Sequence, residues 1–281
     1  MTSIIIPAHN EEAGIARLLG GLVGDDARSD LEVVVVCNGC SDRTAEVARS
    51  FGPRVHVAEL ARPSKAAAVK HGDRLVTTFP RLYVDADIEL TTRDVDALVA
   101  TLSQPGIEAA APRRILVRAG VSRLARAYYD VWEELPHVQA GLFGRGVLAV
   151  SERGFERIRA LPEVMSDDLA ISEAFSANER RIAGDAEARV RPARTWRALV
   201  HRRVRVRIGT HQLITAGLAG ARSITHGSDL LRVVRMKPRL AARVPVFMAT
   251  ALLVRILARS RSRQGLADAW LRDDTSRDMR P

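Results

Sequence analysis

Aromatic residues, cysteines and long apolar runs are all scarce in this chain of 281 residues. Phe, Trp and Tyr make up 4% of it, too little for base stacking to support a nucleic-acid-binding protein. We interpret Cys37 and Cys40 as turn residues rather than as a redox or zinc-binding pair. The longest apolar run, 244–254, is shorter than the ~20 residues that span a bilayer. Because the chain also opens on a strand pattern without a signal peptide, we expect a cytoplasmic protein.

Two glycine-rich nucleotide motifs are also missing. No G-x-G-x-x-G follows the first strand pattern, which argues against a dinucleotide-dependent oxidoreductase. Residues 7–12 read PAHNEE, without the glycine-rich phosphate loop that a sugar-1-phosphate nucleotidyltransferase needs. Both classes are therefore disfavoured.

Positive charge, by contrast, is plentiful and unevenly placed. The formal net charge is +10; residues 189–281 hold 21 Lys and Arg against 5 Asp and Glu, and residues 1–188 hold 22 against 28. A basic final third implies an anionic partner such as phosphate groups, an anionic membrane surface or nucleic acid. We expect no nucleic acid, although a non-enzymatic nucleic-acid-binding protein is the alternative of a different class. The oligomeric state is left open.

Strand and helix patterns alternate over the first 90 residues. Residues 31–37 contain an unbroken run of four β-branched valines, as in a parallel strand covered on both faces. The alternation predicts a doubly wound α/β sheet, whose ligands bind beyond the carboxyl ends of its strands. The predicted strands are 3–7, 31–37, 54–60 and 81–87, and the predicted helices are 10–23 with Asn10 as its cap, part of 38–51, and 65–76.

The alternation weakens after residue 90. A strand pattern follows the glycines of 140–151, and residues 181–192 predict a hairpin. The predicted helices are 91–102, capped by Thr92, then one within the segment 126–138 that ends before Pro136, and finally 166–181 and 238–263.

Three acids stand at alternate positions at the end of the fourth predicted strand and just beyond it, Asp85, Asp87 and Glu89. Strand periodicity places them on one face, where like charges are costly unless a cation lies among them. A pair of carboxylates suits Mg²⁺ or Mn²⁺, which leave their other positions to water and substrate phosphates. The D-x-D pattern therefore predicts a metal and diphosphate site.

Five segments in order resemble the inverting glycosyltransferases of family 2: SIIIPAHNEE, VVVVCNGCSDRTAEVA, SKAAAVKHG, LYVDADIEL and SDDLAISEAF. The resemblance covers roughly residues 2–210. It implies a GT-A fold, with a mostly parallel central sheet flanked by helices and a basic helical C-terminal extension. The implied domains are 1–210, with a nucleotide-binding half of about 1–90 and an acceptor-side half of about 91–210, and the extension 211–281.

The resemblance also assigns the donor-nucleotide site. Cys37 and Asn38 stand where the family commonly has aspartates, which favours uracil but leaves guanine and thymine open. Asp42 either contacts the nucleotide or caps the following helix. The implied donor-nucleotide-binding residues are Pro7, His9, Asn10, Glu11, Asn38, Asp42, Lys65, Asp85 and Ala86.

Metal, diphosphate and catalytic residues follow in the same way. Asp87 with Asp85 would hold Mn²⁺ or Mg²⁺, with His211 as a further ligand; Arg202 and Arg205 in RRVRVRIG would bind the diphosphate. Asp168 matches the family's general base, with Asp167 supporting it. First-turn acids that favour the helix dipole are the simpler explanation of this pair.

The resulting expectation is a metal-dependent inverting glycosyltransferase that uses a nucleotide-diphosphate sugar, with UDP favoured. The acceptor hydroxyl would belong to cell-envelope or extracellular polysaccharide or to a lipid-linked saccharide, because the tail 270–277 resembles bacterial members with such roles. A small-molecule or natural-product acceptor is the alternative. Helix 238–263 either contacts an anionic membrane at the inner face of the cell membrane or packs on the enzyme body.

Overall fold

The computed structural model describes residues 1–24, 30–161, 167–217 and 225–263. Within these ranges seven strands form one sheet in the order β3-β2-β1-β4-β6-β5-β7. The strands are β1 (Thr2–Ala8), β2 (Leu31–Asn38), β3 (Val55–Leu60), β4 (Arg81–Val84), β5 (Ala109–Leu116), β6 (Val147–Val150) and β7 (Arg180–Val190). The helices are α1 (Glu12–Val23), α2 (Thr44–Arg49), α3 (Lys65–Leu75), α4 (Thr92–Leu102), α5 (Arg123–Trp132), α6 (Pro136–Ala140), α7 (Glu152–Arg159), α8 (Asp167–Glu173), α9 (Trp196–Thr215), α10 (Gly227–Met236) and α11 (Val244–Arg263).

The N-terminal half of the sheet is covered on both faces, as its sequence predicts. Along β1, Ile4 and Ile6 enter the largest core cluster, with residues of α1 and α4. Ile5, between them, enters a separate cluster with Val34, Val36 and Ala68 of α3. Alternate side chains of β1 thus serve opposite layers, which is why its sequence is apolar without a break. The doubly wound fold is confirmed.

One edge of the sheet gathers the chain segments that matter for function. β1 pairs in parallel with β2 and β4, and β5 pairs in parallel with β7. β6 runs antiparallel to both of its neighbours, β4 and β5. The carboxyl ends of β1, β2, β4 and β7 therefore lie at the same edge as the amino end of β6. Polar residues that follow those strands, or precede β6, converge there.

Two predicted helix caps are wrong. Glu11 occupies the cap position of α1, whereas Asn10 has a positive φ of 52° and accepts a 2.8 Å hydrogen bond from the Ser41 amide through Oδ1. Asn10 thus joins two strand-end loops. Helix α4 is capped by Thr91 rather than Thr92, in a reciprocal capping box with Asp94.

The predicted hairpin over 181–192 is also wrong, because these residues belong to the single strand β7. β7 pairs with β5 along its whole length, and the register skips between the pairs Pro112–Ala183 and Arg113–Glu187. The turn-forming residues Gly184 and Asp185 fall in this irregularity, so they bulge the strand instead of reversing it. The predicted helix 166–181 ends at Glu173, and 126–138 divides into α5 and α6.

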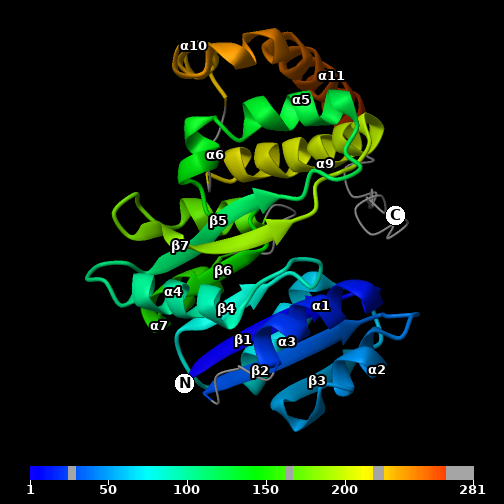
Figure 1. Ribbon diagram of the computed structural model, residues 1–281, viewed down its shortest axis with the longest axis vertical. Helices are drawn as coiled ribbons and strands as arrows, with labels where there is room; N and C mark the ends of the chain where they lie inside the picture. Colours follow the sequence, from blue (N-terminus) through cyan, green and yellow to red (C-terminus); the bar gives the residue numbers. More distant parts are fainter. Residues whose placement is uncertain (25–29, 162–166, 218–224, 264–281) are drawn as a thin grey trace.

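Helices α5, α9, α10 and α11 form a layer at the end of the molecule opposite β1–β3 (Figure 1). Tyr128 of α5 stacks on Phe247 of α11 at 4.9 Å, and Trp196 of α9 donates a 3.0 Å hydrogen bond to Thr250. Helix α11 therefore packs on the enzyme body. The predicted boundary at residue 210 falls inside α9, and the part of the extension beyond residue 263 lies outside the described residues.

The segment Pro238–Arg261 is long and apolar enough to cross a membrane, with a mean hydropathy of 1.8. This holds by length and composition alone, a test that a packed helix of a soluble protein also passes. The expectation from the eleven-residue run 244–254, that the chain has no such segment, is corrected on this point.

Candidate active site

A cleft of about 330 Å³ opens at the converging edge of the sheet. It brings together six of the residues singled out in the sequence, namely Pro7, Lys65, Asp85, Asp87, Asp168 and Arg202. They come from β1, α3, the turn after β4, α8 and α9, so segments up to about 195 residues apart meet around one space.

The two aspartates of the D-x-D pattern lie in a turn rather than on a strand. β4 ends at Val84, and the Asp85 amide donates a 2.8 Å hydrogen bond to the Gly146 carbonyl. The Lys65 ammonium contacts Asp85 Oδ1 at 2.8 Å, in a half-exposed ion pair. Glu89 does not join them, because its carboxylate accepts a 2.9 Å hydrogen bond from Arg191.

These aspartates fit a hard divalent cation that is bound together with its substrate. Asp85 and Asp87 both line the cleft, and Mg²⁺ or Mn²⁺ commonly takes one or two carboxylates plus phosphate oxygens. No three His, Cys, Asp or Glu side chains gather into a metal cluster anywhere in the described part of the chain. His211 does not line the cleft, and its role as a metal ligand stays a prediction.

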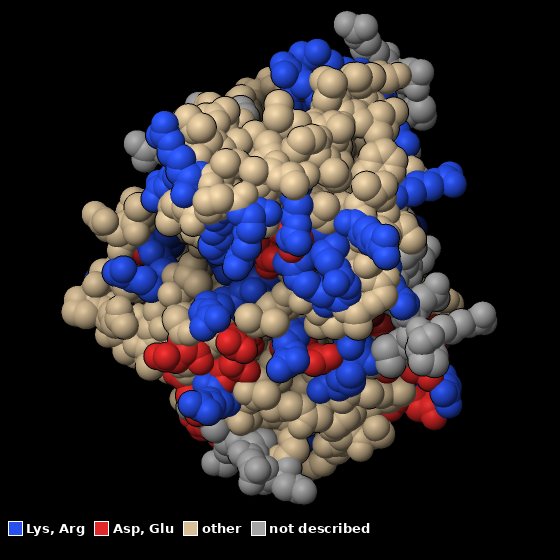
Figure 2. Space-filling model, turned by 45° about the horizontal axis from the view of Figure 1, so that its top comes forward, with Lys and Arg blue, Asp and Glu red and all other residues tan. Residues whose placement is uncertain are grey.

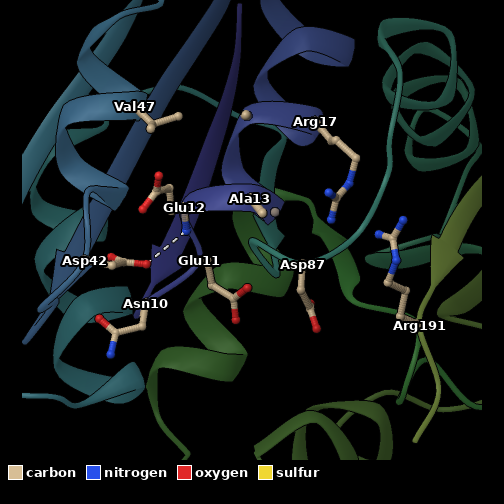
Figure 3. A pocket seen from close by; sticks show the side chains of 11 residues that line it. Asn10, Glu11, Glu12, Ala13, Arg17, Asp42, Val47, Asp87 and Arg191 are labelled. Atoms are coloured by element: carbon tan, nitrogen blue, oxygen red, sulfur yellow. Dashed lines mark hydrogen bonds between the residues drawn. The ribbon is translucent and has the colours of Figure 1, made fainter. Parts of the chain in front are cut away.

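A second hollow, of about 480 Å³, adjoins the cleft beside Asp87. In Figure 3 the carboxylates of Glu11 and Asp87 point into the same open space, and the guanidinium groups of Arg17 and Arg191 turn toward one another beside Asp87. Burial, followed by repulsion from Arg191, lowers the pKa of Arg17. A polyanion entering here would meet two closely spaced cations.

Sequence reasoning missed both of these arginines. Arg191 directly follows β7, so the wrong hairpin removed it from the strand ends where ligands were expected. Arg17 lies on α1, which comes very close to the aspartate turn: a Cβ on Gly14 would lie 2.7 Å from the Ala86 carbonyl oxygen. Glycine at position 14 was the available signal, because it permits this close approach of backbone to backbone.

Asn38 and His9 tie the strand ends together. The Asn38 side chain is buried; its Nδ2 donates to the Ala8 carbonyl at 2.8 Å, and its Oδ1 accepts from the Ser64 amide at 3.0 Å. His9 Nδ1 contacts the Asn38 carbonyl. Because its polar atoms already bond the backbone, Asn38 orients the loops around the nucleotide side rather than presenting a free amide to it.

Asp42 bonds the starts of two helices, which resembles the capping alternative. It also lines the hollow beside Asp87, so its contact with the nucleotide stays a prediction. It accepts hydrogen bonds from the Thr44 amide and hydroxyl and, at 3.2 Å, from the Glu12 amide (Figure 3). Burial alone would raise the pKa of Asp42, but the hydrogen bonds from Thr44 and Glu12 outweigh it and lower that pKa. Asp42 thus stays ionised at the starts of α1 and α2.

Both cysteines are free thiols, but Cys37 lies in β2 and is not the turn residue that the sequence predicts; Cys40 lies in the loop after the strand. Cys37 is buried in the core cluster of β2, and Cys40 is partly buried. Burial, with a contribution from Cys40, raises the pKa of Cys37 to about 12. A thiol that stays protonated at neutral pH is a poor nucleophile and a poor metal ligand.

Asp168 sits at the start of α8, where it faces the glycine-rich loop before β6. Its Oδ2 accepts a 3.1 Å hydrogen bond from the Gly144 amide, and its Oδ1 accepts from the Leu169 amide at 2.9 Å. Arg145 holds this loop, since its buried guanidinium donates to the carbonyls of Gly141 and Pro112 among others. The side chain of Asp167 lies outside the described residues.

Only one face of α9 reaches the site. Arg202, Arg203, Val206 and Thr210 line a pocket that adjoins Asp168. With 3.6 residues per turn, these positions fall within about 100° of one another on the helix. Arg205 and His211 lie roughly 110° and 130° from the middle of that face, and neither lines the cleft or its two adjoining pockets. Arg203, rather than Arg205, accompanies Arg202.

Residues 3–150, more than half of the chain, match the sequence profile of glycosyl transferase family 2. The chain belongs to glycosyl transferase family 2. Over 102 residues it is 35% identical to a 4,4'-diaponeurosporenoate glycosyltransferase of Staphylococcus aureus strain RF122 / ET3-1, and over 93 residues 33% identical to that of Staphylococcus haemolyticus. These matches cover 34% and 31% of this chain, but only 27% and 24% of the relatives.

Solved structures of other glycosyltransferases share the fold of this family 2 chain. A mannosyltransferase from Pyrobaculum calidifontis, in complex with GDP-mannose and Mn²⁺, superposes with a TM-score of 0.62 at 20% identity, over 95% of this chain and 79% of that one. Glucosyl-3-phosphoglycerate synthase from Mycobacterium tuberculosis was solved with Mn²⁺, UDP-glucose and phosphoglyceric acid. It superposes with a TM-score of 0.57 at 19% identity, over 79% of this chain and 81% of that one. At these identities the likeness establishes the GT-A fold.

Proposed function

We propose that this protein is a metal-dependent inverting glycosyltransferase that moves a sugar from a nucleotide-diphosphate donor to an acceptor hydroxyl. The observation that supports this most directly is the single cleft that joins Lys65, Asp85 and Asp87 to Asp168 and Arg202. Cation-binding carboxylates and a candidate base face one space, as transfer between a diphosphate donor and a hydroxyl requires. Family membership supports the same reaction.

In the proposed reaction Asp168 accepts the proton of the acceptor hydroxyl. The acceptor oxygen bonds to the anomeric carbon on the face opposite the diphosphate, and the bond from that carbon to the diphosphate oxygen breaks with its electron pair. The Gly144 and Leu169 amides orient the carboxylate of Asp168. Lys65, Arg191 and Arg202 offer positive charge to the departing diphosphate. Mn²⁺ or Mg²⁺ held by Asp87 with Asp85 would supply further charge neutralisation.

The donor nucleotide can be identified by ligand stabilisation. We expect one of UDP, GDP, dTDP and CDP, with UDP favoured, to raise the melting temperature in the presence of Mn²⁺ and to have little effect with EDTA. At a hundred times its dissociation constant a ligand adds about 2.7 kcal/mol to the free energy of unfolding. Thermal unfolding scans would measure the shift. Failure of all four diphosphates with metal would reject the proposal, and RNA or DNA would then be tested against the basic surface.

Two classes of acceptor have support. Polysaccharide or a lipid-linked saccharide of the cell envelope is the acceptor that the sequence resemblance implies. The Staphylococcus relatives are named for one small molecule, 4,4'-diaponeurosporenoate, which makes a small-molecule acceptor the second candidate.

A membrane surface is the proposed setting for an apolar acceptor. Met248, Leu252 and Ile256 lie four residues apart on α11, and their side chains are 56%, 60% and 54% exposed. They form an apolar stripe on the face of α11 away from its contacts with α5 and α9. Exposed arginines at 239, 243, 255 and 259 flank the stripe, as a helix at the surface of an anionic bilayer requires. We place the enzyme at the inner face of the cell membrane on this basis.

Vesicle sedimentation tests this contact. We expect the protein to sediment with phosphatidylglycerol vesicles and to remain in solution with phosphatidylcholine vesicles. Met248→Gln, Leu252→Gln and Ile256→Gln should each weaken binding by about tenfold or more, because burying such a side chain contributes about 1.5–3 kcal/mol and about 1.4 kcal/mol is tenfold in affinity. Equal sedimentation of the wild type and a triple variant would show that the stripe does not contact lipid.

A further inference from the structure

A third pocket, of about 120 Å³, meets the cleft at Asp168. Gly144, Asp168 and Arg202 line both spaces. Arg114, Trp132 and Arg203 line the small pocket and not the cleft, whereas Lys65, Asp85 and Asp87 line the cleft and not the small pocket. Asp168 therefore stands between a space built for the donor and a separate space whose contents the donor does not explain.

The small pocket carries an excess of positive charge. Three arginines, at positions 114, 202 and 203, line it against the single carboxylate of Asp168. Glu133 does not line the pocket; it attracts Arg114 but makes its ion pair with Arg118. Figure 2 shows that basic side chains gather in a broad group across the middle of the face in view, with acidic side chains beside them. Among the residues that line the pocket, arginines therefore outnumber carboxylates three to one.

The guanidinium of Arg114 is fixed by a stacking contact and a hydrogen bond. Its guanidinium lies 4.2 Å from the centre of the Trp132 ring, and its Nη1 donates to the Gly144 carbonyl at 3.3 Å. Among the described residues its buried Nε–H has no hydrogen-bond partner. Burial lowers the pKa of Arg114 to about 10, and repulsion from Arg202 and Arg203 acts in the same direction against attraction to Glu133. An anion in the pocket would relieve the repulsion.

Arg203 approaches the same aromatic surface. Its guanidinium carbon lies 5.8 Å from the centre of the Trp132 ring and 5.9 Å from that of Tyr128. Stacked guanidinium groups have restricted freedom, so they lose little entropy when they form paired hydrogen bonds to a planar or tetrahedral anion. The pocket therefore has preorganised donors and an apolar wall.

We propose that the acceptor carries an anionic group, a phosphate or a carboxylate, which Arg114 and Arg203 bind while the acceptor hydroxyl lies at Asp168. This inference rests on the proposed transferase function, because it takes the cleft as the donor site. It restricts the acceptor to phosphorylated or acidic molecules, whether soluble or lipid-linked. A neutral sugar or alcohol would bring no negative charge to Arg114 and Arg203.

Calorimetric titration separates this proposal from the proposed function. The protein is first saturated with Mn²⁺ and the nucleoside diphosphate that stabilises it, and is then titrated with glycerol, glycerol phosphate and glycerate. We expect at least one anionic probe to bind at least tenfold more tightly than glycerol. Lysophosphatidic acid in a parallel titration distinguishes the sources: tighter binding than glycerol phosphate indicates a lipid-linked acceptor, and equal binding a soluble one.

Three variants make the test specific. Arg203→Gln should weaken the anionic probe at least tenfold, and Arg114→Lys, which keeps the charge but loses the planar group, should weaken it severalfold. Arg207→Gln, on an exposed position of the same helix, should bind the probe as the wild type does. Dissociation constants for the nucleotide should stay within twofold in all three. If no diphosphate binds, the same probes are titrated into the wild type and the three variants without nucleotide.

Three results would overturn the proposal. Anionic probes could bind no better than glycerol, or both Arg203→Gln and Arg114→Lys could bind them as the wild type does. Saturation with the diphosphate could also abolish probe binding, which would assign the arginines to the donor. A protein that binds no nucleotide with metal would reject the proposed function instead, so the two failures remain distinct.

Discussion

Replacement of Asp168 by asparagine should lower the turnover number by about 10²–10⁴-fold, the usual contribution of a general base. Asparagine has nearly the same shape, and its carbonyl oxygen can keep the hydrogen bond from the Gly144 amide. It cannot take a proton from the acceptor hydroxyl. Nucleotide affinity should stay within about twofold, because the proposed role of Asp168 is to take a proton from the acceptor hydroxyl and not to contact the nucleotide.

The rate can be measured before the natural acceptor is known. Release of the nucleoside diphosphate from its nucleotide sugar, with water as acceptor and Mn²⁺ present, also needs a base. Glu173→Gln is the matched control, because Glu173 ends the same helix and pairs with Arg180 outside the cleft. If Asp168→Asn releases diphosphate at the wild-type rate and Asp167→Asn does not, the base is Asp167. Wild-type rates in both would remove this pair from catalysis.

The sequence predicts the first half of the fold well because local and tertiary preferences agree there. β2 has four consecutive valines at its centre and is buried on both faces there, so its composition and its environment favour the same structure. β5 was missed for the opposite reason. It is rich in alanine and contains Pro112, a residue that argues against a central strand. Its place between β6 and β7 is fixed by partners far away in the sequence.

The candidate site was predictable where it depends on strand ends and unpredictable where it depends on helix faces. Pro7, Lys65, Asp85 and Asp87 follow or flank predicted strands and do line the cleft. The contribution of α9 depends on which of its side chains point inward. No helix over 196–215 is predicted from the sequence, which therefore gives no such direction. Matching Arg205 to a family position therefore selected the wrong neighbour of Arg202.

The alternating acids of the D-x-D segment illustrate the same limit. Alternation placed Asp85, Asp87 and Glu89 on one strand face, but β4 ends at Val84 and the turn that follows separates them. Glu89 reaches Arg191 instead, at the far strand β7. Strand periodicity cannot foresee where β4 stops, because its partner β6 lies more than 60 positions later in the sequence.

Replacement of Asp87 by alanine should remove the dependence of nucleotide binding on metal. If Asp87 holds the cation across the diphosphate, its loss should raise the dissociation constant in Mn²⁺ by about 100-fold or more. A ligand concentration that stabilises the wild type by about 2.7 kcal/mol would then stabilise the variant by only about 0.4 kcal/mol. For a domain of this size the wild-type shift corresponds to roughly 5–10 °C, and the variant's to about 1 °C.

Two further variants distinguish loss of a ligand from loss of structure. Asp87→Asn keeps the shape of the side chain and its place beside Arg17 and Arg191, but it removes the charge that a hard cation needs, so it should behave like Asp87→Ala. Asp96→Ala removes an exposed acid of α4 that does not line the cleft, and its Mn²⁺-dependent shift should equal that of the wild type. A full Mn²⁺-dependent shift in both Asp87 variants would show that the cation, if one is bound, is held elsewhere. Asp85, which contacts Lys65 directly, would then be the next residue to test.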